Sequence, residues 1–393
     1  MRKIKPSKKL KSNNDKNVKS KLKISACYIV KNEAKNLPRS IDSLKTQVDE
    51  IIVVDTGSTD NTIEIAKSYG AKVIETKWQD DFSAPRNLAI DNATGDWIIF
   101  IDADEFFVKP DKVRAAVEKL SNTDGIFVMR IDIDEDNNYQ EINRDWYLRA
   151  FRNVDYLRYR GMIHENVENI NGGSFPRVLA NEDLLLYHTG YGQTKAESKL
   201  RRNLSIIQLE AKKYGEKPQH YIALADCYFG LADYEKTLYY AEKTLTAEVR
   251  PITGLASLYR KIFTSMHKLN FPLEDILNVA DEAIETLPQN PEFYVERGFI
   301  FYVLKQYDKA YNDLKESLNV WHNMLKASVK KNSYFDYLAE EVYVKLTELE
   351  AMAGNYKAAK HNLKEAIKLA PQNNLYKQKY VELENIEKSM NNV

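Results

Sequence analysis

Short apolar runs alternate with amphipathic helical stretches over the N-terminal quarter of the chain. Strand-sized apolar runs occupy residues 24–30, 51–54, 71–75 and 97–102, and helical periodicity connects them. The run at 51–54 has no polar alternation, which is typical of a strand buried on both faces of a sheet. Strands that alternate with helices indicate βαβ units. The pattern therefore predicts an α/β domain with a mostly parallel sheet.

Beyond about residue 194 the pattern becomes continuously helical, after a less regular stretch at 106–190. Three helical segments share one register and open at Tyr234, Tyr307 and Tyr356. They resemble tetratricopeptide repeats, which recur about every 34 residues. The first two tyrosines are 73 residues apart, close to two such periods, with a degenerate unit near 256–287. The next interval is 49 residues, which predicts an insertion near 321–337 in an all-α repeat domain.

Charge divides the chain of 393 residues, although its total is zero, because Lys and Arg number 57 and so do Asp and Glu. Residues 1–23 hold ten basic side chains and one acid, which leaves the remainder with 47 basic and 56 acidic groups, a net charge of −9. The overall balance excludes a protein that binds nucleic acid along its whole length by counterion release. We expect a basic disordered arm at 1–22, an α/β domain at 23–193 and helical repeats at 194–393.

The two cysteines, Cys27 and Cys227, lie far apart in apolar surroundings, which excludes a disulfide framework and a Cys-based zinc site. No apolar segment follows the charged N-terminus, and no run approaches the ~20 residues that span a bilayer. We expect a cytoplasmic protein without a transmembrane segment. The basic arm adds the alternative of a peripheral location at the inner face of the membrane.

Two carboxylates follow the apolar run at 97–101, in the sequence Asp102-Ala103-Asp104. Residues i and i+2 of a strand share a face, and paired carboxylates at a sheet edge suit a hard divalent cation. Such a cation can neutralise a diphosphate leaving group. Most motifs of this kind are solvated loop acids, but the preceding apolar strand and the βαβ context favour a metal site.

A second polar group, formed by Asp55, Ser58 and Asp60, follows the run at 51–54. In open α/β sheets the ligand lies beyond the carboxyl ends of the strands. A turn of this composition can accept hydrogen bonds from a nucleobase or a ribose. The same residue types also form turns and helix caps without any ligand, and the spacing leaves both interpretations open.

Four motifs resemble the inverting glycosyltransferases of family 2, which have the GT-A fold, a Rossmann-like α/β architecture. They stand in the order and at the spacing of that family, and they are CYIVKNE (27–33), VDTGSTDNT (54–62), DFSAPRN (81–87) and WIIFIDADE (97–105). The resemblance implies a nucleotide-sugar donor, which we expect to be a UDP-sugar, and a divalent cofactor, Mg²⁺ or Mn²⁺.

The resemblance also assigns residues to the donor site. The nucleotide-sugar-binding set is Glu33, Asp55, Ser58, Arg86, Asp102 and Ala103. Glu33 and Asp55 would lie by the base and ribose, and Arg86 near the diphosphate, where a fixed cation suits phosphate. Asp102 would contact the ribose or a metal-bound water, and Asp104 would bind the metal.

Later motifs, RAFRN (149–153), GMIHE (161–165) and LYHTG (186–190), are similar to a bacterial subgroup in which such a domain leads into tetratricopeptide helices. That subgroup includes enzymes that glycosylate Cys or Ser of peptide bacteriocins (glycocins). By this resemblance His188 is a candidate third metal ligand beside Asp102 and Asp104, although a lone histidine is more often structural. Glu165 is the candidate general base, with His164 as the alternative base or as the group that orients Glu165.

These observations predict a metal-dependent hexosyl- or N-acetylhexosaminyltransferase that acts on a Ser, Thr or Cys side chain of a peptide or protein. The repeats favour such an acceptor, since helical-repeat arrays offer extended concave surfaces. The rival acceptor is a lipid-linked or cell-envelope saccharide. Another interpretation is that the repeats form a homodimer interface, and a third is a non-catalytic scaffold whose transferase domain is inactive.

Overall fold

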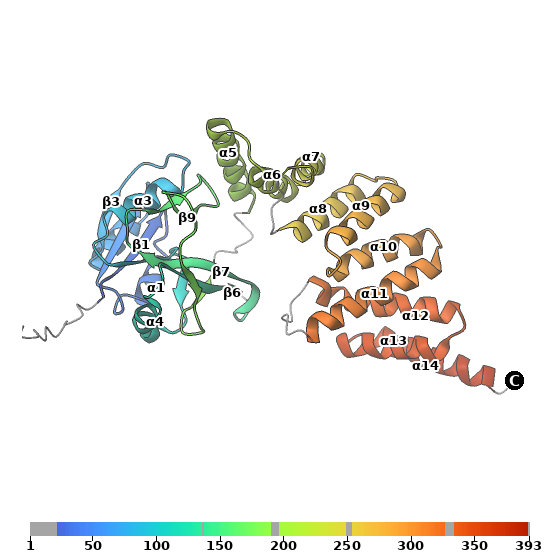
Figure 1. The fold of residues 1–393 in the computed structure, drawn as a ribbon. Coiled ribbons are helices and arrows are strands. Elements are labelled where there is room, and N and C mark those ends of the chain that lie inside the picture. Colours follow the sequence, from blue (N-terminus) through green and yellow to red (C-terminus); the bar gives the residue numbers. More distant parts are fainter. Residues whose placement is uncertain (1–21, 136, 190–195, 249–253, 327–333, 392–393) are drawn as a thin grey trace, which may run out of the picture. The chain divides into compact units, whose positions relative to one another are not determined.

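The computed structural model describes residues 22–135, 137–189, 196–248, 254–326 and 334–391 (Figure 1). The chain divides into two compact units, Met1–Tyr214 and Gly215–Val393. This division falls one helix later than the boundary expected after residue 193, because α5 (Ala196–Tyr214) belongs to the first unit. The guanidinium of Arg202 on this helix stacks 5.2 Å from the ring centre of Phe82 in that unit. The expected basic arm, 1–22, lies outside the described residues except for Leu22.

The first unit is built on a large mixed sheet in the order β3-β2-β1-β4-β7-β6-β11-β5. Its parallel half consists of β1 (Ile24–Val30), β2 (Glu50–Asp55), β3 (Lys72–Glu75) and β4 (Trp97–Phe100). The other half consists of β5 (Glu105–Phe107), β6 (Gly125–Asp134), β7 (Gln140–Arg152) and β11 (Leu185–His188). Strand β7 runs antiparallel to both β4 and β6, whereas β11 is parallel to β6. The expected mostly parallel α/β fold is confirmed.

Helices cover both faces of the parallel half, which explains its continuous apolar runs. Alternate residues of β1 point to opposite sides, so that Tyr28 and Cys27 join different core clusters. The first cluster also contains residues of α1 (Leu37–Asp42), α2 (Thr62–Ser68) and α4 (Val113–Leu120). The second contains residues of α3 (Ser83–Asp91).

Three short strands complete this unit. Strand β10 (Arg177–Leu179) pairs with β6, and β8 (Leu157–Arg160) forms an antiparallel hairpin with β9 (Asn166–Asn169). The DFSAPRN segment (81–87), which leads into α3 and forms its first turn, makes hydrogen bonds to that hairpin. The Asn87 side chain exchanges hydrogen bonds with the backbone of Tyr159, at 3.0 and 2.9 Å, and the Phe82 N–H donates to Met162 O at 2.8 Å.

The second unit consists of four helix pairs followed by α14 in its described residues, which confirms the expected tetratricopeptide-like architecture. The helices are α6 (Pro218–Gly230), α7 (Tyr234–Leu245), α8 (Leu255–Lys268), α9 (Leu273–Thr286), α10 (Pro291–Val303), α11 (Tyr307–Lys326), α12 (Ala339–Met352), α13 (Tyr356–Leu369) and α14 (Asn374–Asn391). The three tyrosines of the shared register begin α7, α11 and α13, and the degenerate unit forms α8 and α9. Gly298 permits close packing in the pair α10–α11, since a Cβ there would lie 3.1 Å from Leu314 Cγ.

Of the insertion expected near 321–337, the described residues form the C-terminal end of α11 and a 3₁₀ turn at Tyr334–Tyr337, while 327–333 lie outside the described residues. Trp321 packs against Phe335, with 5.4 Å between ring centres, and its indole N–H donates to Asp336 Oδ1 at 2.8 Å. In the described part of both units, no helix has the length and apolar character needed to cross a membrane.

Candidate active site

The loops that follow β1 and β2 interlock at the carboxyl edge of the sheet. The Asn32 N–H donates to Ser58 Oγ at 2.8 Å, and Asn32 Oδ1 accepts the Thr59 N–H at 2.7 Å. Asn32 has a φ of 58°, a left-handed conformation that asparagine tolerates better than most residues. The Glu33 N–H donates to Thr62 Oγ1 at 2.8 Å. These contacts place Glu33 beside the turn that begins at Asp55, while Ser58 serves to hold the two loops together.

Asp55 is buried at the end of β2, and its two carboxylate oxygens have different surroundings. Oδ1 accepts the N–H groups of Gly57 and Ser58 at 2.9 and 2.8 Å. Oδ2 is buried and has no hydrogen-bond partner among the described residues. A buried acceptor without a partner costs free energy, so this oxygen is suited to an N–H or O–H donor of a ligand. A cavity of about 300 Å³ begins at the following residue, Thr56, and Trp78 and Asn87 also line it.

Asp102 stands between two arginines. Its Oδ1 accepts from Arg86 Nη2 at 3.0 Å, and its Oδ2 accepts from Arg149 Nη2 at 2.7 Å. Burial alone would raise the pKa of Asp102, but the charges of Arg149 and Arg86 outweigh it and hold this pKa below its ordinary range. Asp102 is therefore an ionised carboxylate with both oxygens already engaged.

Glu105 supports the Asp102-Ala103-Asp104 turn from inside the domain. It is completely buried, forms ion pairs with Arg149 and Arg130, and accepts the Asp102 N–H on Oε2 at 3.1 Å. Burial raises the pKa of its carboxyl despite the attraction of Arg149. Glu105 thus links the backbone of the turn to the guanidinium that holds the side chain of Asp102.

Glu165 reaches the same cluster from the turn between β8 and β9. Its Oε1 accepts from Arg86 Nε at 2.6 Å, and its side chain is 11% exposed. Arg86 therefore bridges Glu165 and Asp102, and its guanidinium also lies 4.6 Å from the ring centre of Phe100. The adjacent His164 is exposed, with a φ of 54°.

Asp104 pairs with His188 rather than with the arginines. His188 Nε2 lies 3.3 Å from Asp104 Oδ2, and its Nδ1 lies 2.8 Å from Oδ1 of the buried Asp132. Burial lowers the pKa of His188, but the hydrogen bonds to Asp104 and Asp132 outweigh it and raise this pKa to about 9. Thr189 fixes the turn from the other side, since its N–H donates to Asp104 O at 3.1 Å.

The structure thus brings together two of the three expected metal ligands, Asp104 and His188. The carboxylate of Asp102 is engaged by arginines, and within the described ranges no group of three His, Cys, Asp or Glu side chains is arranged around a common point. A carboxylate and an imidazole nevertheless fit a Mg²⁺ or Mn²⁺ ion that takes its other ligands from water and substrate phosphates.

Residues 25–176 match the family described as Glycosyl transferase family 2. These residues form a family 2 glycosyltransferase domain. The match contains Asp55, Arg86, the Asp102–Asp104 turn and Glu165, whereas His188 lies beyond its C-terminal end.

Curated relatives resemble part of the chain. A TPR repeat-containing protein of Synechococcus elongatus is 37% identical over 182 residues, which cover 45% of this chain and 44% of that protein. The SPbeta prophage-derived glycosyltransferase SunS of Bacillus subtilis is 31% identical over 204 residues, covering 50% of this chain and 47% of SunS. The chain spans less than half the length of these relatives.

Among solved structures, glucosyl-3-phosphoglycerate synthase of Mycobacterium tuberculosis, in complex with Mn²⁺, UDP-glucose and phosphoglyceric acid, is 25% identical. The alignment covers 28% of this chain and 44% of that one, with a TM-score of 0.24.

Three residues of this site were not singled out from the sequence, namely Arg130, Asp132 and Arg149, and Glu105 was noted only as the last residue of the WIIFIDADE motif. A signal for two of them is present, because Arg130, Asp132 and Asp134 occupy alternate positions at the end of a strand that begins as an apolar run. Arg149 lies in the RAFRN motif. That motif contributed to the family resemblance, but it did not indicate that this arginine binds Asp102.

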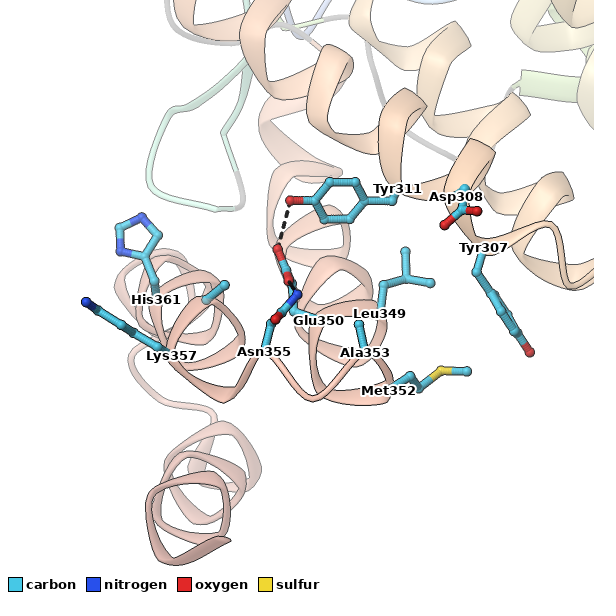
Figure 2. A pocket seen from close by; sticks show the side chains of 11 residues that line it. Tyr307, Asp308, Tyr311, Leu349, Glu350, Met352, Ala353, Asn355, Lys357 and His361 are labelled. Carbon is cyan, nitrogen blue, oxygen red and sulfur yellow. Dashed lines mark hydrogen bonds between the residues drawn. The ribbon is translucent and has the colours of Figure 1, made fainter. Parts of the chain in front are cut away.

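The repeat unit has a concave site of its own, a pocket of about 930 Å³ between the start of α11, the end of α12 and the start of α13 (Figure 2). Glu350 lies at its centre, accepting from Tyr311 Oη at 2.8 Å and from Asn355 Nδ2 at 3.0 Å. Met352 is 58% exposed at the rim. Figure 2 shows Tyr307 and Asp308 at one end of the pocket, with Lys357 and His361 at the other.

Proposed function

We propose that this protein transfers a sugar from a UDP-sugar to a Ser, Thr or Cys side chain of a peptide or protein. The observation that supports the proposal is a set of three features at one edge of a family 2 domain. They are the Asp55 Oδ2 atom without a hydrogen-bond partner, the Asp102 carboxylate bound by two arginines, and the Asp104–His188 pair. Each group suits a different part of a nucleotide sugar.

Asp55 suits the uracil base. Its Oδ2 is an acceptor, and uracil presents one imide N–H, so a single oxygen meets a single donor. Asp102 then lies on the ribose side, where its partly exposed carboxylate can accept a hydroxyl hydrogen while the arginines hold it in place. We assign Glu33 and Ser58 to the loops that shape this part of the site.

Asp104 and His188 would hold the Mg²⁺ or Mn²⁺ ion. When bound, such an ion supplies positive charge beside the diphosphate and so stabilises the leaving group. Arg86 would add a fixed charge from the protein itself, since its guanidinium is kept in position by Glu165, Asp102 and the ring of Phe100.

Inversion at the anomeric carbon requires a base that removes the acceptor proton opposite the departing diphosphate. We assign this role to Glu165, with His164 as the alternative. The contact with Arg86 orients the Glu165 carboxylate, and its position in the turn between β8 and β9 places it beside Asp102 through their shared arginine.

The repeat unit is the proposed acceptor-binding part. Its pocket combines tyrosine rings and apolar groups with charged residues at both ends, which suits a polypeptide segment with mixed side chains. SunS, a glycosyltransferase by name, and the repeat-containing relative each align with about half of this chain, which agrees with a transferase domain joined to repeats.

The deciding experiment incubates the protein with Mn²⁺, a mixture of UDP-sugars and a peptide panel that contains Ser, Thr and Cys, and then measures peptide mass and free UDP. We expect one sugar mass on a peptide and a matching release of UDP. Transfer only to a saccharide or lipid-linked acceptor would overturn the peptide assignment. Absence of UDP release with every donor, together with unchanged partner binding by Asp104→Ala, would indicate a scaffold instead.

A further inference from the structure

Asp132 is a buried carboxylate in the middle of a strand, a position normally occupied by an apolar side chain. It is 1% exposed and lies between Ile131 and Ile133 of β6. Strand β11 pairs in parallel with β6 so that His188 is directly opposite Asp132. Opposed residues of neighbouring strands project on the same face of the sheet, which puts the carboxylate beside the imidazole.

The neighbours of Asp132 include a nitrogen group at each of its oxygens. Oδ1 faces His188 Nδ1 at 2.8 Å and Arg130 Nε at 3.1 Å, and Oδ2 accepts from Asn143 Nδ2 at 3.4 Å. The contact with Arg130 is an ion pair without a hydrogen bond, and a carboxylate only accepts hydrogen bonds. The hydrogen in the contact with His188 therefore belongs to Nδ1.

The orientation of the ring follows from this contact. With Nδ1 bonded to hydrogen and directed at Asp132, the opposite nitrogen, Nε2, is the one directed at Asp104 Oδ2, 3.3 Å away. A metal ion binds an imidazole nitrogen only through its lone pair, so the tautomer with hydrogen on Nδ1 is the one that can bind a metal at Nε2.

We propose that Asp132 is a positioning residue for the divalent cation, which fixes the tautomer and the ring orientation of His188 so that Nε2 and Asp104 bind the ion together. The inference rests on the proposed function, because it assumes that this pair binds the donor's cation. In many metal sites a carboxylate behind a ligating histidine changes metal affinity by about 10–100-fold.

Asp132→Asn is the sharpest substitution, since it keeps the shape and removes one acceptor oxygen. The variant removes the negative charge that faces His188 Nδ1, and it keeps an oxygen toward His188 only where Asn143 turns its own amide oxygen to the new NH₂ group. The matched control is Asp145→Asn, which removes the same charge at an exposed position of the neighbouring strand β7. Near-ultraviolet circular dichroism establishes that both variants fold.

The measurement is the dissociation constant of Mn²⁺ in the presence of UDP, obtained by electron paramagnetic resonance of the free ion. We expect Asp132→Asn to weaken Mn²⁺ binding about 10–100-fold and Asp145→Asn to change it less than about twofold. A folded Asp132→Asn protein with wild-type Mn²⁺ affinity would overturn the inference. If Asp104→Ala also binds Mn²⁺ normally, the cation site of the proposed function is wrong and the inference falls with it.

A second measurement uses the wild-type protein and needs no folded variant. Long-range ¹H–¹⁵N spectra with the diamagnetic probe Zn²⁺ distinguish the two nitrogens of His188. We expect a hydrogen on Nδ1 and a metal-shifted Nε2, a signature that a merely structural Asp132 would not require. A hydrogen on Nε2 in the metal-bound protein would overturn the inference.

Discussion

The guanidinium of Arg149 holds the carboxylate of Asp102, with 2.7 Å between Nη2 and Oδ2. The same nitrogen also contacts Glu105, which is fully buried and accepts the Asp102 backbone N–H. One arginine from β7 therefore supports both the side chain and, through Glu105, the main chain of the turn that follows β4.

Removing this arginine should destabilise the first unit. Arg149→Met leaves Glu105 buried with only the more distant Arg130, at 3.5 Å, and loss of one partner of a buried ion pair costs about 3–5 kcal/mol. We expect a lower thermal unfolding midpoint, followed by tryptophan fluorescence. The double variant Arg149→Met/Glu105→Gln should recover part of the loss, because it removes the uncompensated charge. Equal midpoints for wild type and Arg149→Met would contradict the role of this pair.

Asp104 should determine metal-dependent turnover. Asp104→Ala removes one of the two proposed ligands and should lower Mn²⁺-dependent transfer by about a hundredfold or more, in line with several kcal/mol of charge stabilisation. UDP binding measured without metal should stay within about twofold of wild type. Activity that survives the substitution would remove Asp104 from the metal site.

Asp55 offers a test of base recognition. Because two backbone N–H groups require an oxygen at Oδ1, Asp55→Asn should place its NH₂ group where Oδ2 was. That group opposes the imide N–H of uracil but matches the acceptor nitrogen at the same position of cytosine. We expect UDP affinity to fall about tenfold, because two donors that face each other without an acceptor cost about 1–3 kcal/mol. We also expect the preference for UDP over CDP to shrink. Calorimetric titration with both nucleotides measures this, and an unchanged ratio would place the base elsewhere.

The extent to which these features follow from sequence depends on how far apart the interacting residues are. The parallel strands were predicted because local patterns carry them. The Asp102-Ala103-Asp104 motif was expected to present both carboxylates on one strand face, but β4 ends at Phe100 and the motif forms a turn whose two carboxylates have different partners. The repeat register was also predicted correctly, because each of its three tyrosines is the first residue of a helix, α7, α11 or α13. The contacts of Arg149 and Asp132 were not predicted, because they depend on β7 lying between β4 and β6 and on β11 pairing with β6. No local periodicity specifies which distant strands become neighbours.

Glu165 should affect chemistry more than binding. Glu165→Gln retains an oxygen that can accept from Arg86 Nε, so the arginine stays in place while the basic oxygen is lost. We expect transfer to a serine peptide to fall about 10²–10⁴-fold, the usual contribution of a general base, with little change in UDP-sugar affinity. Transfer to a cysteine peptide should fall less than transfer to a serine peptide, because a thiol with a pKa near ~8.5 is already partly ionised at neutral pH. Equal losses in transfer and donor binding would make Glu165 a binding residue, and a larger loss in His164→Ala would move the base there.

The repeat-unit pocket should govern acceptor affinity independently of the donor site. Ala353 lines the pocket at the end of α12 and is exposed, so Ala353→Trp fills part of the 930 Å³ space without disturbing the core. Lys377→Trp is the matched control, since it adds the same ring at an exposed position of α14. We expect the KM for a peptide acceptor to rise at least about fivefold in Ala353→Trp, as for loss of an interface contact worth more than 1 kcal/mol. Hydrolysis of the UDP-sugar by water should remain unchanged in both variants, because it does not require the acceptor. If the peptide KM responds equally to both substitutions, or to neither, the pocket does not bind the acceptor, and the peptide must be recognised by the family 2 domain alone.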